Sequence, residues 1–545
     1  MLLSRFTLER LKSAGVDHVF GLPGDYVLDF YKELWDSQEI QVINCTDENH
    51  AGFAADAYAR VHGVGCVCIT YNVGALKVAN AVACAFAERS PLIVISGAPG
   101  MKERTEDILL HHMVGNFNSQ HKMFKEITCA SVVIDNLNTA AYQIDFALER
   151  MKHYKRPIYI ELPRDLCKQS ISYDVYKQGT PNAPLTDQEN LEEAIGEVHD
   201  WLRESERPAI LAGVELARYN LGDKLVKFAE RHDIPVATTL LSKSVVNERH
   251  PLFAGIYGGE MSHQHTKEII EDSDCLIMLG AMLTDMTLCF KPAKFKKRKV
   301  ISASIEGLKI RNHAFESVQF GDFCKELFKL DLEHKFVKPK SLLPKVNVTP
   351  TFAPKAETKM TVARLFEKIN SILTKEMAIV ADIGDSLFGA ADLQVHHRNH
   401  FLSPAFYTSM GSAIPGALGV QTAMPDVRPI VIVGDGAFQM ACTELSTIVE
   451  KKLNPIVFVL NNKGYTTERY LLDGKFNDIR NWNYHDVTAM LGGGAGFLVQ
   501  TEEELEKAVQ TALDSKALSV INVIIGAKDI SQGLRRMTEA LAKRV

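Results

Sequence analysis

Acidic and amide side chains follow two neighbouring apolar segments in the last third of this sequence. The first segment, 429–433, ends in Gly434-Asp435-Gly436, and 24 residues separate this triplet from Asn461-Asn462, which ends the second segment, 455–460. The residues between them have a helical pattern, so we predict one βαβ unit whose parallel strands end at the same sheet edge. Carboxylate and amide oxygens are ligands that Mg²⁺ prefers. We therefore expect Asp435 and Asn462, with a nearby backbone carbonyl, to bind Mg²⁺.

The glycines of the same triplet favour a phosphate beside this metal site. Gly436 lets the backbone approach a phosphate closely, and the start of the following helix attracts its negative charge. The triplet alone is weak evidence, because glycine makes up about 7% of an average protein. A tight turn followed by a polar strand end is the alternative. The complete order of strand, triplet, helix, strand and asparagine pair is much rarer than the triplet.

The elements that must position these residues follow an α/β pattern along nearly the whole chain. Short β-branched segments alternate with helical periodicity, which is typical of parallel sheets covered by helices. Segments 169–188 and 335–357 lack apolar periodicity and are rich in Pro, Thr, Lys and Asn, so we interpret them as linkers. We predict three doubly wound α/β domains, at 1–172, 188–334 and 358–545. The predicted strands are 65–71, 92–96, 158–162, 209–212, 235–239, 275–279, 300–303, 378–381, 429–433, 455–460 and 520–525.

Composition excludes several other classes of protein. The net charge of −6 over 545 residues argues against nucleic acid as the main partner. The longest apolar runs are too short to cross a bilayer, and the first residues fit an amphipathic helix better than a signal peptide. Ten cysteines occur without paired ligand spacing, and Cys66 and Cys68 would face the same side of one strand. Reduced core cysteines are typical of a cytoplasmic chain.

The arrangement around Asp435 resembles the diphosphate-and-metal motif of thiamine-diphosphate enzymes, and a stretch near the N-terminus resembles a second part of that family. Cys45 to Gly52 (CTDENHAG) closes a predicted strand and opens a helix. Within it, Glu48 is similar to the glutamate that activates the cofactor by holding a proton on its pyrimidine ring. An ordinary glutamate at a helix start is the alternative for Glu48, and Asp47 is a competing choice for the activating role.

Four further features resemble one branch of that family, the pyruvate and indolepyruvate decarboxylases. They are a glycine turn at 20–26 with a catalytic Asp25, the pair His111-His112, Glu468 shortly after the asparagine pair, and two loops at 71–76 and 95–99 that face the cofactor. Each has a structural alternative. A histidine pair is more often a surface feature, as we interpret His396-His397 and His263-Gln264-His265, and Asp25 could cap a helix near Val27. Their joint occurrence in the right order favours the resemblance.

The resemblance implies a non-oxidative decarboxylation of a 2-oxo acid to an aldehyde and CO₂ through a thiamine-diphosphate enamine, with Mg²⁺. Asp25, His112 and Glu468, with His111 behind them, would move protons during the reaction. Met410 would hold the cofactor in a bent shape. The resemblance also implies a homo-oligomer, with a dimer as the smallest active unit and a tetramer common. The residues implied to contact the cofactor are Glu48, Tyr71, Met410, Gly434, Asp435, Gly436 and Asn462, and those for the metal are Asp435, Asn462 and Gly464.

Residues around the expected substrate pocket indicate a preference for large substrates. The stretch 384–388 resembles bacterial pyruvate decarboxylases but has Leu387 where they have tryptophan, and Met286 replaces a tyrosine in a looser match. Thr467 and Leu471 match other pocket positions and are modest in size. A wider apolar pocket gains about 0.8 kcal/mol for each substrate methylene that it buries. We therefore expect branched, long-chain or aromatic 2-oxo acids to be preferred over pyruvate.

Two other readings keep the cofactor but change the activity. A carboligase of the acetolactate-synthase type generally lacks the histidine pair and the glutamate after the asparagine pair, and this chain has both. A non-catalytic cofactor-binding homologue predicts damage to the proton-moving residues, yet Glu48, Asp25, His112 and Glu468 are all present. A dinucleotide-dependent dehydrogenase is disfavoured because no GxGxxG turn opens a helix.

Overall fold

The computed structural model of this chain describes residues 1–105, 109–171, 184–289, 295, 299–332, 336, 343–344 and 351–542. The predicted domain limits at 172 and 334, and much of both predicted linkers, lie outside these residues. The chain forms two compact units. The first comprises 1–183, 411–427 and 441–453, and the second comprises 184–410, 428–440 and 454–545.

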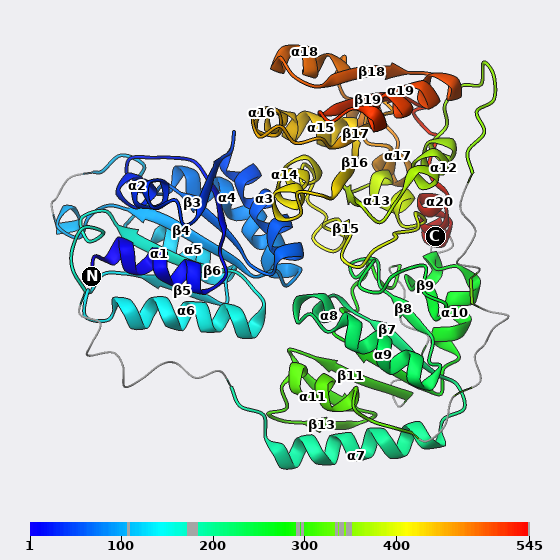
Figure 1. Ribbon diagram of the computed structural model, residues 1–545, viewed down its shortest axis with the longest axis horizontal. Coiled ribbons are helices and arrows are strands. Elements are labelled where there is room, and N and C mark those ends of the chain that lie inside the picture. The colour runs from blue at the N-terminus through cyan, green and yellow to red at the C-terminus, as the bar shows by residue number, and fades with distance from the viewer. Residues whose placement is uncertain are drawn as a thin grey trace. The chain divides into compact units, whose positions relative to one another are not determined.

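The first unit is built on a six-stranded parallel sheet with the order β2-β1-β3-β4-β6-β5. Strands β3, β4, β5 and β6 of this sheet are labelled in Figure 1. Its apolar core lies between the sheet and α1, α2 and α6, and both Cys66 and Cys68 belong to this core, as expected for alternate residues of one strand. The strands are β1 (His18–Gly21), β2 (Gln41–Asn44), β3 (Gly65–Ile69), β4 (Leu92–Ala98), β5 (Ala130–Val133) and β6 (Ile158–Pro163). The helices are α1 (Leu3–Ser13), α2 (Leu28–Ser37), α3 (Glu48–His62), α4 (Val73–Ala87), α5 (Ser119–Glu126) and α6 (Ala140–Tyr154).

Three elements from the C-terminal third also belong to the first unit. They are α14 (Ala413–Ala423), η4 (Cys442–Glu444) and α16 (Leu445–Glu450). Helix α14 packs so closely on α3 that a Cβ atom at Gly419 would lie 2.0 Å from the carbonyl oxygen of Ala54. Glu444 accepts hydrogen bonds from the backbone and hydroxyl of Thr46, at 3.1 and 2.7 Å. This packing fixes the chain just before Glu48.

The second unit contains a seven-stranded sheet with the order β13-β12-β11-β10-β7-β8-β9. The predicted parallel pairing is found for β7 to β11, but β12 and β13 are antiparallel because two-residue turns join β11 to β12 and β12 to β13. The strands are β7 (Pro208–Ala212), β8 (Val236–Thr238), β9 (Phe253–Ile256), β10 (Cys275–Leu279), β11 (Val300–Ser304), β12 (Gly307–Ile310) and β13 (His313–Phe315). The helices are α7 (Gln188–Glu204), α8 (Val214–Arg218), α9 (Gly222–His232), α10 (Gln264–Glu271) and α11 (Phe320–Leu327).

A third sheet, also in the second unit, is wholly parallel with the order β15-β14-β16-β17-β19-β18. Its core lies between one sheet face and α12, α13, α19 and α20. The strands are β14 (Met377–Ala381), β15 (Phe401–Leu402), β16 (Arg428–Gly434), β17 (Ile456–Asn461), β18 (Ala495–Val499) and β19 (Ser519–Ile524). The helices are α12 (Val362–Ile372), α13 (Asp385–Ala390), α15 (Asp435–Ala441), α17 (Thr466–Leu471), α18 (Val487–Leu491), α19 (Glu502–Asp514) and α20 (Gln532–Ala542).

Two chain-wide features complete the fold. All the cysteines except Cys129 are buried, in keeping with their interpretation as core residues. Among the helices of the described residues, none has both the length and the apolar character needed to cross a membrane.

Candidate active site

Polar residues gather where strand order reverses in the first and third sheets. In the first sheet β1 lies between β2 and β3, and Asp25 and Tyr71 follow the carboxyl ends of β1 and β3. In the third sheet β14 lies between β15 and β16; Asp435 directly follows β16, and Asp385 lies four residues after the end of β14. Open α/β sheets bind ligands at such reversals, because the neighbouring connections leave toward opposite faces.

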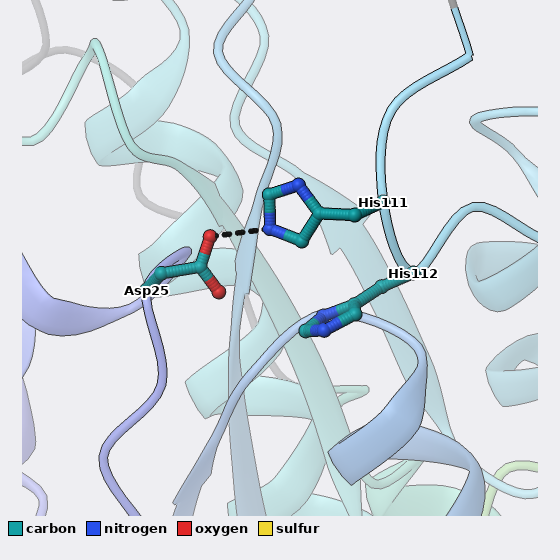
Figure 2. A group of neighbouring side chains, drawn as sticks. All are labelled: Asp25, His111 and His112. Carbon is teal, nitrogen blue, oxygen red and sulfur yellow. Dashed lines mark hydrogen bonds and ion pairs between the residues drawn. The ribbon is translucent and has the colours of Figure 1, made fainter.

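In the first unit the structure brings Asp25, His111 and His112 together (Figure 2), although Asp25 and His111 are 86 positions apart in the sequence. Nε2 of His111 lies 2.7 Å from a carboxylate oxygen of Asp25, and the two histidine rings meet edge to face with centroids 4.7 Å apart. Asp25 and His111 are exposed, whereas His112 is half-buried. The predicted relay residues of this unit therefore form one group.

Tyr26 contacts this group and holds His111 in place. Its ring is buried and stacks on His111 at 4.7 Å, and its hydroxyl donates to the His111 carbonyl at 3.2 Å. A Cβ atom at Gly97 would lie 2.2 Å from the Tyr26 carbonyl oxygen, so only glycine permits this approach of β4 to the turn. Residues 95–99 were expected to form a loop that faces the cofactor, but 95–98 belong to strand β4, where Gly97 lies against the Tyr26 backbone. Contact of these residues with the cofactor stays a prediction.

A buried hydrogen-bond network holds His112 from the other side. The Asn72 side chain donates to the His112 carbonyl at 2.7 Å, and both residues have positive φ, of 48° and 66°. Such backbone conformations persist only where the surroundings hold them. Gln120, fully buried, accepts from the Asn72 backbone N–H and donates to Ser96 at 2.8 Å and to Tyr159. Tyr159 in turn donates to buried Glu161 at 2.7 Å, and burial raises the pKa of Tyr159.

Sequence reasoning missed Asn72 and Gln120 as supporting residues, and we expect replacement of Gln120 by leucine to be strongly destabilising. The variant would leave the Asn72 N–H and two hydroxyl groups without their buried partner, and each unsatisfied group costs about 1–3 kcal/mol. Urea unfolding should show a loss of about 3 kcal/mol or more. Gln169→Leu, at an exposed glutamine, should stay within about 0.5 kcal/mol of the parent. Similar losses in both variants would contradict a special role for the buried network.

Glu48 is the first residue of α3 and 13% of its side chain is exposed. Its carboxylate pairs with Lys77 at 2.9 Å and lies beside Gly74, where a Cβ atom would come within 3.2 Å. Asp47, the competing choice, accepts from the Asn49 backbone N–H at 2.8 Å and caps the helix. The cap occupies Asp47, so the geometry favours Glu48 as the carboxylate left for another ligand.

In the second unit, Asp435 and Asn462 point their oxygens at one backbone N–H. Gly464 N–H lies 3.2 Å from Oδ2 of Asp435 and 3.2 Å from Oδ1 of Asn462. The other Asp435 oxygen accepts from Gly436 at 2.8 Å. Gly464 has a φ of 151°, and a Cβ atom there would lie 2.1 Å from the Asn477 carbonyl oxygen. Burial raises the pKa of Asp435 to about 6, so a bound cation would stabilise its charged form.

These oxygens line a cavity of about 300 Å³ within the second unit. Met410, Gly434, Thr467 and Glu468 line it as well, so the cofactor and relay residues predicted for this unit share one cavity. Sequence reasoning missed Ser386, whose buried hydroxyl lines the cavity and has no partner among the described residues. The sequence does contain a signal for Ser386: the stretch Gly384-Asp385-Ser386 places a hydroxyl shortly after an apolar strand segment.

The residues present fit a diphosphate, a divalent ion and a pyrimidine ring. Asp435 and Asn462 offer converging oxygens for the ion, and the unpartnered Ser386 hydroxyl offers a donor for a phosphate oxygen. In the first unit the buried Tyr71 hydroxyl likewise has no partner among the described residues. Glu48 offers a carboxyl for a ring nitrogen.

The four predicted substrate-pocket residues have different environments. Thr467 lines the cavity, whereas Leu387 is buried in the core at 1% exposure and Met286 packs against that core. Leu471 is 60% exposed. The contribution of Leu387, Met286 and Leu471 to substrate binding stays a prediction.

Asp385, which also lines the cavity, gives the fold a pH dependence. Burial raises the pKa of Asp385 to about 6, although the Ser531 backbone N–H donates to both of its carboxylate oxygens, at 3.2 and 3.0 Å. Because this folded-state pKa lies above the unfolded value of 3.8, the Asp385 carboxyl should make the folded state less stable as the pH rises from about 4 to about 6. Asp385→Asn should therefore be more stable than the parent at pH 7.5, by up to about 3 kcal/mol, with a smaller gain at pH 5.

Thermal unfolding of the two proteins at both pH values measures this difference. Ser386→Ala, beside Asp385 but without a titrating group, should differ from the parent by the same amount at both pH values. A constant difference for Asp385→Asn would show that burial does not perturb this carboxyl.

Comparisons with known proteins agree with this geometry. Family models of thiamine pyrophosphate enzymes match the chain in three parts: the N-terminal TPP binding domain at residues 1–126, the central domain at 195–327 and the C-terminal TPP binding domain at 382–523. Pyruvate decarboxylase 3 of Arabidopsis thaliana is 32% identical, over 98% of this chain and 92% of the relative. Indole-3-pyruvate decarboxylase of Azospirillum brasilense is 31% identical, over 99% and 98%.

Fold, cavity and matches together define a thiamine-diphosphate enzyme. More specifically, the chain belongs to the family of thiamine-diphosphate-dependent 2-oxo-acid decarboxylases, and it is a carboxy-lyase. The predicted fold class, family and cofactor are therefore confirmed. The two relatives above differ in the substrate that their names give, so the comparisons leave the substrate of this chain open.

Proposed function

We propose that this enzyme uses Mg²⁺ and thiamine diphosphate to convert branched, long-chain or aromatic 2-oxo acids to aldehydes and CO₂. Thiamine diphosphate supplies the electron sink for loss of CO₂. The observation that carries the proposal is the presence in one chain of two sets of residues: the group of Asp25, His111 and His112 in the first unit, and the converging oxygens of Asp435 and Asn462 in the second.

Each set has its own task in the proposed reaction. Asp435, Asn462 and the Gly464 carbonyl hold Mg²⁺, and Gly434 and Gly436 let the diphosphate approach the backbone. Glu48 would hold a proton on the pyrimidine ring nitrogen, Tyr71 would contact the cofactor, and Met410 would fill the space beside the cofactor and support its shape. Asp25, His112 and Glu468, with His111, deliver a proton to carbon after CO₂ leaves and remove one from the product hydroxyl.

The substrate preference is tested with a panel of 2-oxo acids. We expect kcat/KM for 2-oxoisovalerate, 2-oxo-octanoate, phenylpyruvate or indolepyruvate to exceed that for pyruvate, since each buried methylene contributes about 0.8 kcal/mol, roughly fourfold in kcat/KM. Leu387→Trp should reverse this order by lowering kcat/KM for the large acids while pyruvate turnover is retained. The highest kcat/KM for pyruvate with the parent enzyme would contradict the proposed preference.

A carboligase would join the activated fragment to a second carbonyl compound instead of releasing an aldehyde. The presence of both His112 and Glu468 supports aldehyde release, because each can serve the protonation step. Product analysis of one 2-oxo acid with and without added acceptor aldehyde separates the two activities. Acyloin as the main product would favour the carboligase.

We further propose a cytoplasmic homo-oligomer, with a dimer as the smallest active unit and a tetramer as the assembled form. The domain ranges 1–172, 188–334 and 358–545 are part of the same proposal. Sedimentation analysis of the enzyme with its cofactors tests the assembly, and an active monomer would contradict it. The proposed binding partner is a small 2-oxo acid. We propose that the enzyme binds neither nucleic acid nor a membrane.

A further inference from the structure

Asp25, His111 and His112 place one carboxylate and two imidazole rings at one edge of the first sheet (Figure 2). Each residue offers a ligand atom, and these atoms lie within 4.8 Å of one another. Two imidazole nitrogens and a carboxylate oxygen suit Zn²⁺ and similar ions, whereas Mg²⁺ prefers oxygen ligands alone. We propose that these three residues bind a divalent transition-metal ion such as Zn²⁺, and that the bound ion blocks the reaction.

His111 is already held in the orientation that a metal ligand needs. The Tyr26 hydroxyl lies 3.2 Å from the His111 carbonyl oxygen and 3.3 Å from Nδ1 of the ring, and the tautomer of the ring sets the donor of the second contact. Nε2 faces Asp25 at 2.7 Å. At this distance one hydrogen lies between the ring nitrogen and the carboxylate. A metal ion would take the place of that hydrogen, which leaves to solvent, while Tyr26 supports the other ring nitrogen.

His112 supplies the third ligand atom. Its Nδ1 is buried and has no hydrogen-bond partner in the part of the chain that the structure describes. The ring stands edge-on to His111, at 78° between ring planes, and Asn72 fixes the His112 backbone. Coordination through Nδ1 would satisfy a polar atom that is otherwise costly to bury.

The positive charge of Arg164, close to Asp25, opposes the binding of a metal ion at the group of Asp25, His111 and His112. Nη1 of Arg164 lies 3.8 Å from the Asp25 oxygen that faces His111. Arg164 is also paired with Glu103, which accepts from its Nε at 2.9 Å, so much of its charge is compensated. The Asp25 carboxylate therefore remains available to a metal ion.

The chain thus has two kinds of cation site with different donor atoms. Asp435 and Asn462 present oxygens, which suit Mg²⁺, while the histidine group suits softer ions. Zn²⁺ can therefore bind at the histidines without displacing Mg²⁺. Metal binding rests on the observed geometry alone; only the inhibition rests on the proposed function, since a coordinated His112 cannot transfer a proton.

Co²⁺ is the probe for binding, because its visible absorption reports nitrogen ligands. With enzyme saturated with Mg²⁺ and thiamine diphosphate, we expect one Co²⁺ per chain with a visible band that Zn²⁺ abolishes. His111→Gln and His112→Gln should each weaken Co²⁺ binding at least about 100-fold, and Tyr26→Phe, which keeps all three ligands, about 10–100-fold. His263→Gln is the matched control, since His263 stacks on His265 and pairs with Asp392 in the second unit. It should leave the band unchanged.

Two results would overturn the metal site. One is a band that persists in both His111→Gln and His112→Gln, and the other is a band lost in His263→Gln. Zn²⁺ should also inhibit CO₂ release by the parent enzyme, and added Mg²⁺ should not relieve the inhibition. Relief by Mg²⁺ would overturn the proposed mode of inhibition. A Co²⁺ band of the expected kind without inhibition by Zn²⁺ would confirm the site and instead contradict the proton-moving role of His112.

Discussion

Replacing Glu48 by glutamine should lower kcat of the cofactor-loaded enzyme by about 10²–10⁴-fold. Glutamine keeps the size and the hydrogen-bonding oxygen of the side chain but cannot share a proton with a ring nitrogen. The carboxylate is well placed for that task, because only 13% of the side chain is exposed and Lys77 holds it at 2.9 Å. Steady-state release of CO₂ from a preferred 2-oxo acid, at saturating Mg²⁺ and thiamine diphosphate, measures the effect.

Asp47→Asn is the matched control for Glu48→Gln. Asp47 is the neighbouring carboxylate and contacts the same lysine, and asparagine is an equally good helix cap. This variant should keep kcat within a few-fold of the parent. Equal rates for Glu48→Gln and the parent would contradict the activating role of Glu48. They would favour the alternative of a cofactor-binding homologue in which Glu48 is not catalytic.

Replacing Asp435 by asparagine should weaken Mg²⁺-dependent binding of thiamine diphosphate by at least about 10–100-fold. The carboxylate is 1% exposed and accepts from the backbone of Gly436 and Gly464. An amide removes the charge of the side chain and turns an NH₂ group toward one of the two backbone N–H donors. Calorimetric titration of thiamine diphosphate at fixed Mg²⁺ measures the loss.

Asp473→Asn, at a half-exposed surface ion pair with Lys528, should bind the cofactor like the parent. An Asp435→Asn protein with unchanged dependence on Mg²⁺ would place the metal elsewhere.

Mixing the Glu48→Gln and Asp435→Asn proteins adds a test of assembly. If each active site takes Glu48 from one subunit and Asp435 from the other, mixed dimers regain one intact site, and activity should return. Continued inactivity after verified subunit exchange would contradict shared sites.

The buried strands were predictable because they leave a strong local pattern. All eleven predicted strand segments overlap observed strands, among them β10 and β16, since a strand with both faces covered is a continuous apolar run. Several short strands are absent from these segments. β18 (AGFLV) is largely exposed and alternates in burial, β15 has two residues, and β1 (HVFG) is buried but only four residues long. The antiparallel β12 and β13 depend on turns that no apolar run reveals.

Parts of the candidate site were predictable where polar or titratable residues stand together or directly after an apolar segment in the sequence. Asp435 and Asn462 follow strand ends, and His111-His112 is a visible pair. Ser386, Asn72 and Gln120 are single polar residues whose importance depends on burial, and burial of an isolated residue is set by tertiary packing. Burial also differs among the predicted pocket residues: Leu387 is buried in the core while Thr467 lines the cavity, and neither position reveals this in the sequence.

The close seating of Gly419 against Ala54 has a consequence for dissecting this protein. Nine consecutive residues of α14, 413–421, are buried, and that helix belongs to the same compact unit as α3. An excised fragment from residue 358 onward would carry this apolar helix without the N-terminal surface that shields it, and would be prone to aggregate. Sequence-contiguous pieces of this enzyme are therefore poor candidates for separate expression, and exchanges between homologues should move α3 and α14 together.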